Sequence, residues 1–179
     1  MDQTLSHLNV DAVTIGLYHS ELQSVSYLSG VGFTVPSPTR PPVRMGEGLA
    51  GQVLLKQRTC HIRKLQNAAE AANEVLVKRE RFVTYIGIPL IVKGQIKGVF
   101  EVFHRSPLSP TPDWMEFLHT LAGQAAIAID SSQLFENLQR PNQELIQAYD
   151  TTLEGWARAL ELRDRETEGH TRRVTEMTM

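Results

Sequence analysis

The chain has 179 residues, of which 41% are hydrophobic and 21% are charged. This composition is typical of a globular domain of ordinary size with an extension, and it excludes a chain that is disordered throughout. The formal net charge of −2 gives no reason to expect binding to nucleic acid or to acidic lipid.

The sequence favours the cytoplasm, or the cytoplasmic part of a larger protein. Its single cysteine, Cys60, cannot form an internal disulfide, which favours a reducing compartment. Residues 1–10 lack the basic start and apolar run of a signal peptide. The longest uncharged apolar stretch is far shorter than a membrane span, so we expect no membrane contact from this chain.

The first elements are predicted to be two paired strands. Residues 12–18 alternate in polarity, with Val13, Ile15 and Leu17 on one face, which predicts a half-buried strand. Residues 25–28 follow a short polar turn and should pair with it. Four prolines within residues 36–42 then predict a stiff, exposed loop.

The middle of the chain is predicted to alternate between short helices and strands. A helix should begin near residue 46 and run to about 56, followed by a strand over 59–63. Residues 67–79 are rich in Ala and Glu and predict a second helix. Two strands over 85–92 and 96–103 should form a hairpin, because Lys93-Gly94 is a two-residue turn signal.

A long helix is predicted to start after Thr111, which can cap it, with Pro112 and Asp113 in its first turn. Its apolar residues recur at steps of three and four, so they should pack on the sheet: Leu118, Leu121, Ala122, Ala125, Ile129, Ser132 and Phe135. Pro141 is expected to kink or interrupt the helix just before it.

A second apolar seam follows that proline. It consists of Leu145, Tyr149, Leu153, Trp156 and Leu160. The sheet domain offers this seam no partner, so a homodimer through the terminal helices is expected. Folding of the seam back onto its own domain is the competing arrangement.

Because the strands connect through hairpins more than through helices, the fold class should be α+β, with a mainly antiparallel sheet flanked by helices and a C-terminal helical extension.

Three segments, in order, resemble the GAF domain family over about residues 8–139. They are GEGLAGQV at 46–53, GIPLIVKGQIKGV at 87–99 and AGQAAIAI at 122–129 within a closing helix. The resemblance implies a regulatory module that senses a small molecule, whose identity the sequence leaves unknown.

In that family, ligands lie on the sheet face opposite the terminal helices. The resemblance therefore suggests Phe82, Tyr85 and Phe100 as pocket-lining residues, beneath a lid formed by 67–79 and the proline-rich loop. The alternative is that the three aromatic side chains merely fill the core. A basic cluster of Lys78, Arg79 and Arg81 beside them could meet an anionic ligand, although such clusters are usually solvated.

The end of the chain resembles the opening of an HD-GYP domain, a metal-dependent phosphohydrolase that cleaves cyclic di-GMP. The resemblance rests on residues 148–164 and on ETEGHTRRV at 166–174. It implies a domain order of 1–139 GAF sensor, 140–163 linker helix and 164–179 truncated HD-GYP start. Glu166 and His170 match its first two metal ligands, and the intact domain would hold iron or manganese. This chain lacks the motifs that name the family, so we expect it to contain no catalytic residue and no cofactor of its own.

Other sites suggested by relatives are less well supported. Cys60-His61 invites attachment of a bilin or haem, but the pair lies in a strand position away from the chromophore loop of such relatives. The Asn-Lys…Phe…Asp-Glu signature of cyclic-nucleotide-binding members is missing. Methionine-sulfoxide reductase chemistry needs several reactive cysteines, and only one is present.

Two functions remain open. The first is a ligand-sensing and dimerisation module of a bacterial signalling protein, which controls an HD-GYP phosphodiesterase. The second is a fragment of that metal-dependent enzyme, with most catalytic residues outside this chain. In both interpretations the chain by itself is not a working enzyme.

Overall fold

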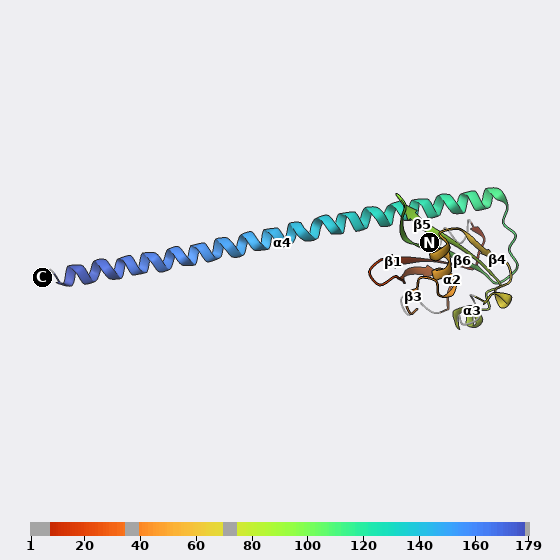
Figure 1. The fold of residues 1–179 in the computed structure, drawn as a ribbon, viewed down its shortest axis with the longest axis horizontal. Coiled ribbons are helices and arrows are strands. Elements are labelled where there is room, and N and C mark those ends of the chain that lie inside the picture. Colours follow the sequence, from red (N-terminus) through yellow and green to blue (C-terminus); the bar gives the residue numbers. More distant parts are fainter. Residues whose placement is uncertain (1–7, 35–39, 70–74, 178–179) are drawn as a thin grey trace. The chain divides into compact units, whose positions relative to one another are not determined.

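The computed structural model describes residues 8–34, 40–69 and 75–177 (Figure 1). It describes the backbone alone for Val75, Arg140, Ala157 and residues 159–177. The chain divides into two compact units, Met1–Ser131 and Ser132–Met179. No helix in the described part is long and apolar enough to cross a membrane.

The first unit is built on a six-stranded antiparallel sheet, in the order β3-β2-β1-β6-β5-β4. The strands are β1 (Ala12–His19), β2 (Ser24–Val31), β3 (Val43–Arg44), β4 (Cys60–Ile62), β5 (Thr84–Val92) and β6 (Gln95–His104). The helices are α2 (Gly48–Lys56), the 3₁₀ helix η2 (Leu65–Asn67), α3 (Val75–Glu80) and α4 (Pro112–Met177). The predicted α+β class is confirmed.

Both faces of the sheet are covered, and each has its own core. One face packs against α2 through Leu49, Val53 and Leu54, in a cluster that also holds Tyr85 and Phe103. The other packs against α4 through Leu118, Ala122 and Ala126, with Ile86 and Val102 from the sheet. Figure 1 shows α4 on one side of the strands and α3 on the other.

The central position of β1 corrects one prediction. We expected a half-buried strand, but Ala12, Val13 and Thr14 are all buried, because β1 lies between β2 and β6 and both its faces are covered. Alternating polarity in a strand does not tell whether the polar face contacts solvent or a second core. Small residues such as Thr and Gly can be buried on that face.

The connections agree with their sequence signals. Lys93 and Gly94 both have positive φ, 50° and 77°, as a tight hairpin with this twist requires. The backbone N–H of Trp114 donates to Thr111 Oγ1 at 3.3 Å, so Thr111 caps α4 as predicted.

The continuous helix predicted over 67–79 is wrong. η2 ends at Asn67, and Ala68 has an extended backbone, with φ −88° and ψ 125°. The buried Leu65, whose N–H donates to Val83 O at 2.8 Å, ties this segment to the sheet and turns it away from a helical path. Residues 70–74 lie outside the described residues, as do 35–39 of the predicted proline-rich loop.

Pro141 was expected to kink or interrupt the long helix, and the interruption is wrong, because α4 continues through it. A proline in a helix removes one N–H donor, here to the carbonyl of Asn137, and crowds that carbonyl. The intact turns on both sides outweigh this local cost. Packing on the sheet ends earlier than predicted: Ile129 is partly buried, but Ser132 and Phe135 are exposed.

Candidate functional site

A buried polar group lies on the α2 face of the sheet, and its centre is Glu101. This carboxylate is fully buried in the middle of β6, on the same face as its neighbours Val99 and Phe103. The hydroxyl of Tyr85, on β5, donates to Glu101 Oε1 at 3.0 Å. The hydrogen bond restricts the orientation of the carboxylate.

Gly87 creates the room for this pair. It lies opposite Glu101 in the β5–β6 register. A Cβ at Gly87 would collide with the Tyr85 hydroxyl and would lie 2.6 Å from Val53 Cγ2. A glycine at this strand position therefore allows the tyrosine hydroxyl to lie along the sheet toward the carboxylate.

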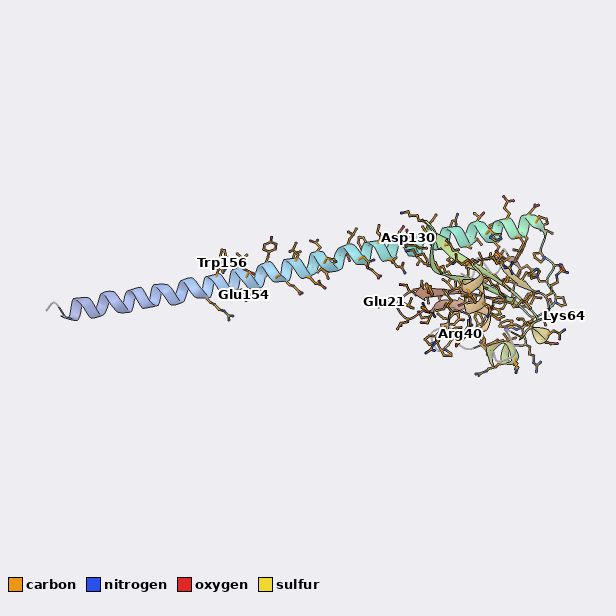
Figure 2. All side chains as sticks on the ribbon, viewed as in Figure 1. Glu21, Arg40, Lys64, Asp130, Glu154 and Trp156 are labelled. Carbon is orange, nitrogen blue, oxygen red and sulfur yellow. The ribbon has the colours of Figure 1, made fainter. Side chains whose placement is uncertain are left out.

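Arg40 supplies the opposite charge from a loop. Its guanidinium carbon lies 3.6 Å from the centre of the Tyr27 ring and 5.6 Å from that of Phe33. Its Nη1 lies 3.9 Å from Glu101 Oε2, and the Arg40 side chain is only 8% exposed. That Nη1 makes no hydrogen bond in the described part of the chain. The side chain is labelled in Figure 2, across the sheet from α4 in unit 1.

The aromatic residues predicted to line one pocket separate between the two faces. Phe82 and Tyr85 lie together with Phe103, at ring-centre distances of 5.0 and 5.1 Å from it. Phe100 points to the other face and belongs to the core beneath α4. The prediction is therefore wrong for Phe100, because successive side chains of a strand alternate between faces. Phe33 is the third aromatic residue that packs with Phe82 on this face, at a ring-centre distance of 5.7 Å.

A second polar network holds α3 against the sheet. The buried Glu80 accepts from Thr34 N and Thr34 Oγ1, both at 2.7 Å, and from Arg105 Nη2 at 3.0 Å. Arg105 also contacts Asp11: the backbone N–H of Arg105 donates to Asp11 Oδ2 at 2.6 Å, and Arg105 Nη1 lies 3.5 Å from Asp11 Oδ1. Its guanidinium covers the Phe82 ring at 4.8 Å. The network joins the start of β1 and the ends of β2 and β6 to α3.

The basic cluster beside this network faces solvent. Lys78, Arg79 and Arg81 are exposed, whereas the intervening Glu80 points inward. The structure therefore does not bring the three cations to the buried polar group, and Arg40 is the basic residue that reaches it.

Cys60 and His61 point to opposite faces of the sheet. Cys60 packs with the α2-face core, whereas His61 pairs with Ile86, whose side chain is in the α4-face core. Burial lowers the pKa of His61, and the nearby charge of Arg63 lowers it further, against a backbone hydrogen bond at Leu108 that raises it. The two side chains thus do not form a joint attachment site.

Metal ligands are not gathered in the part of the chain whose side chains are described: no three His, Cys, Asp or Glu residues there could hold a metal ion together. Glu166 and His170 lie four residues apart on α4, so the predicted helical spacing holds for the backbone. Their side chains lie outside the described residues. Two ligands on one helix do not close a coordination shell, and iron or manganese would need further ligands from elsewhere.

The predicted seam of the second unit is an exposed face of α4. Leu145, Tyr149, Leu153 and Trp156 are between 55% and 69% exposed, and the side chain of Leu160 lies outside the described residues. Figure 2 shows Trp156 projecting from the helix. Leu134 and Leu138 extend the same face toward the N-terminus and are equally exposed. Isolated exposed leucines are ordinary, but a continuous line of them is typical of an interaction surface.

The GAF domain family is matched by this chain over residues 1–129. The chain belongs to the GAF domain family. GAF domains are regulatory, non-catalytic sensor modules of signalling proteins. No relative of curated function matches the sequence.

Solved GAF structures share the fold. The GAF domain of a phosphoenolpyruvate-protein phosphotransferase from Coxiella burnetii has a TM-score of 0.68 at 17% identity, over 74% of this chain and 79% of that one. The corresponding Acinetobacter domain has a TM-score of 0.63 at 20% identity, covering 76% and 80%. A GAF domain/HD domain protein from Geobacter sulfurreducens has a TM-score of 0.64 at 12% identity, covering 75% and 89%. At these identities the likeness concerns the fold alone.

Sequence reasoning named Phe82 and Tyr85 on the α2 face of the sheet but missed the polar residues beside them. Glu101 could have been noticed, because it is the one charged residue in the apolar run from Val99 to Phe103. Arg40 and Tyr27 carry no such signal. Their contact joins a loop to a strand, and nothing in the local pattern predicts that approach.

Proposed function

We propose that this chain is a ligand-sensing and dimerisation module of a bacterial signalling protein, and that it controls an HD-GYP cyclic di-GMP phosphodiesterase. The ligand binds on the α2 face of the sheet, around Glu101, Tyr85 and Arg40. The output passes through α4. The proposed order of parts is a sensor over 1–139, a linker helix over 140–163 and the start of the HD-GYP domain over 164–179.

The observation that carries this proposal is the continuity of α4. One helix contributes Leu118, Ala122 and Ala126 to the core of the sheet unit and then continues into the exposed apolar face. A change in packing on the sheet is thereby linked mechanically to any partner of the later residues. A helix pair with two alternative packings is a common device by which such modules bias an output domain.

The spacing of the exposed face supports a second copy of the chain as its partner. Leu134, Leu145 and Trp156 are eleven residues apart, and so are Leu138, Tyr149 and Leu160. Eleven residues make slightly more than three complete helical turns, about 20° in excess, so these side chains form a nearly axial stripe. A parallel second copy would present an identical stripe in register. A fragment of a metal-dependent phosphohydrolase is the second candidate, supported by the spacing of Glu166 and His170 on α4.

The dimer is tested by sedimentation equilibrium on the full chain. The wild type should be a dimer, and Leu153→Asp with Trp156→Asp should make it monomeric, because two charges would be buried in the interface. Gln147→Asp with Thr151→Asp is the matched control. It adds the same charges on the opposite side of α4 and should leave the dimer intact. A monomeric wild type, or a dimer unaffected by the first pair, contradicts the proposal.

A further inference from the structure

The fixed part of the buried polar group is the carboxylate side chain of Glu101. Glu101 lies on β6, between β1 and β5, at the centre of the sheet, and it is fully buried. Tyr85 donates to one of its oxygens at 3.0 Å. A buried carboxylate needs compensating charge or hydrogen bonds, and a nearby cation such as the Arg40 guanidinium adds to the Tyr85 hydrogen bond in this role.

Two aromatic rings lie beside the Arg40 guanidinium, which is itself next to Glu101. The ring of Tyr27 lies on β2 with its face against the guanidinium, and the Phe33 ring lies on the same side. Ring faces attract cations, most strongly where water is excluded. A buried carboxylate next to aromatic faces is a chemical environment that selects an organic cation.

Arg40 is an imperfect occupant of this environment. An arginine and a carboxylate at a well-built pair form two parallel hydrogen bonds. Here the closest approach is 3.9 Å, and Nη1 makes no hydrogen bond within the described residues. Arg40 also comes from a loop that continues into the exposed Pro41 and Pro42, whereas Glu101 and Tyr27 lie on strands. The positive charge therefore comes from a loop residue, whereas the carboxylate and the Tyr27 ring are fixed on strands.

We propose that Glu101, Tyr27 and Phe33 form a binding site for a small organic cation, and that Arg40 fills this site as an intramolecular substitute for the ligand. The ligand class is a guanidinium or alkylammonium compound, which displaces Arg40 from the rings. An anionic ligand at Arg40 is disfavoured, because it would lie next to the buried and immobile Glu101 carboxylate. This inference rests on the proposed function, since it names the class of ligand that the sensor receives.

The test is chemical rescue of an emptied site. Isothermal titration calorimetry is carried out on the full chain with methylguanidinium as the probe and with N-methylurea as its neutral counterpart of similar shape. Arg40→Ala should bind methylguanidinium saturably and at least tenfold more tightly than the wild type, which must first release Arg40. N-methylurea should give no saturable heat. Arg44→Ala, which removes an exposed arginine from β3, should behave as the wild type.

Adding Glu101→Gln to Arg40→Ala should weaken methylguanidinium binding at least tenfold. Circular dichroism checks that each variant is folded, and Arg40→Met, which keeps the length of the stem, replaces Arg40→Ala if the latter is unfolded. The proposal is overturned if the emptied site does not bind methylguanidinium saturably, or if it binds N-methylurea equally well. It is also overturned if the wild type binds acetate saturably and Arg40→Ala does not, since Arg40 would then recognise an anion.

This experiment is independent of dimerisation. Methylguanidinium binding with a monomeric wild type would support the cation site and contradict the helix-pair output. A dimer without methylguanidinium binding would leave the proposed sensor intact and reject the ligand class.

Discussion

The two units of this protein use the same helix in opposite ways. In the sheet unit, α4 buries Leu118, Ala122 and Ala126 against the strands. In the second unit the described apolar side chains, from Leu134 to Trp156, are exposed. The first unit is thus complete as a folding unit, with two cores on one sheet. In the second unit no described surface covers the apolar face of α4, so we expect the order of this unit to depend on a partner.

The largest expected effect comes from making the same Leu→Ala substitution in the packed part of α4 and in its exposed part. Leu118→Ala should destabilise the sheet unit by about 2–5 kcal/mol, since it leaves a cavity beneath α4. Leu145→Ala should change the stability of that unit by less than about 0.5 kcal/mol, because an exposed residue leaves no cavity. Urea unfolding followed by tryptophan fluorescence, at a concentration where the chain is monomeric, measures both. Equal losses would show that the two units do not differ in this way.

An intermediate effect is expected at the network that ties α3 to the sheet. Arg105→Ala removes two side-chain donors from Glu80 and one side-chain contact from Asp11, and should cost about 1–3 kcal/mol. The exposed Lys78→Ala is its control and should be nearly neutral. Hydrogen exchange should show the loss at Val77 and Phe82 and not in residues 142–156. Faster exchange in the second unit would mean that the network supports α4 as well.

The smallest effect concerns the end of the packed part of α4. Lys97 Nζ lies 2.7 Å from Asp130 Oδ1, and this hydrogen bond, followed by the charges of Lys97 and Lys93, holds the pKa of Asp130 below its ordinary range. A lowered carboxyl pKa stabilises the folded state above the ordinary pKa of about 3.9, and the contribution is lost as the pH falls through the folded value. Asp130→Asn should therefore be slightly less stable than the wild type at pH 7, and this difference should shrink as the pH falls to 2.

Thermal unfolding at both pH values, with and without 0.5 M salt, measures this difference. High salt should reduce it at pH 7, because the pair lies near the surface. A difference that does not shrink between pH 7 and pH 2 would show that Asp130 acts through its shape and not through its charge.

The sequence predicted the parts of this fold that depend on local chemistry. Thr111 as a cap, Lys93-Gly94 as a turn and the strands around them need only their own neighbours. The errors arise where distant residues decide. Pro141 stays helical within a long helix, the residues after Asn67 follow the buried Leu65, and Phe135 is exposed although its spacing continues the apolar stripe. The candidate site shows the same division: Tyr85 was found from the sequence, whereas the contact of Arg40 with Tyr27 exists only in three dimensions.

The eleven-residue stripe on α4 imposes a rule on the length of any connector. Each residue rotates the helix by about 100°, so removing seven or eleven residues turns everything beyond the cut by only about 20°. Removing five residues turns everything beyond the cut by about 140°, so the apolar side chains there would face another direction around the helix axis. Output domains grafted behind this sensor should therefore respond in phase with the deletion length, active at some lengths and silent or inverted at those between.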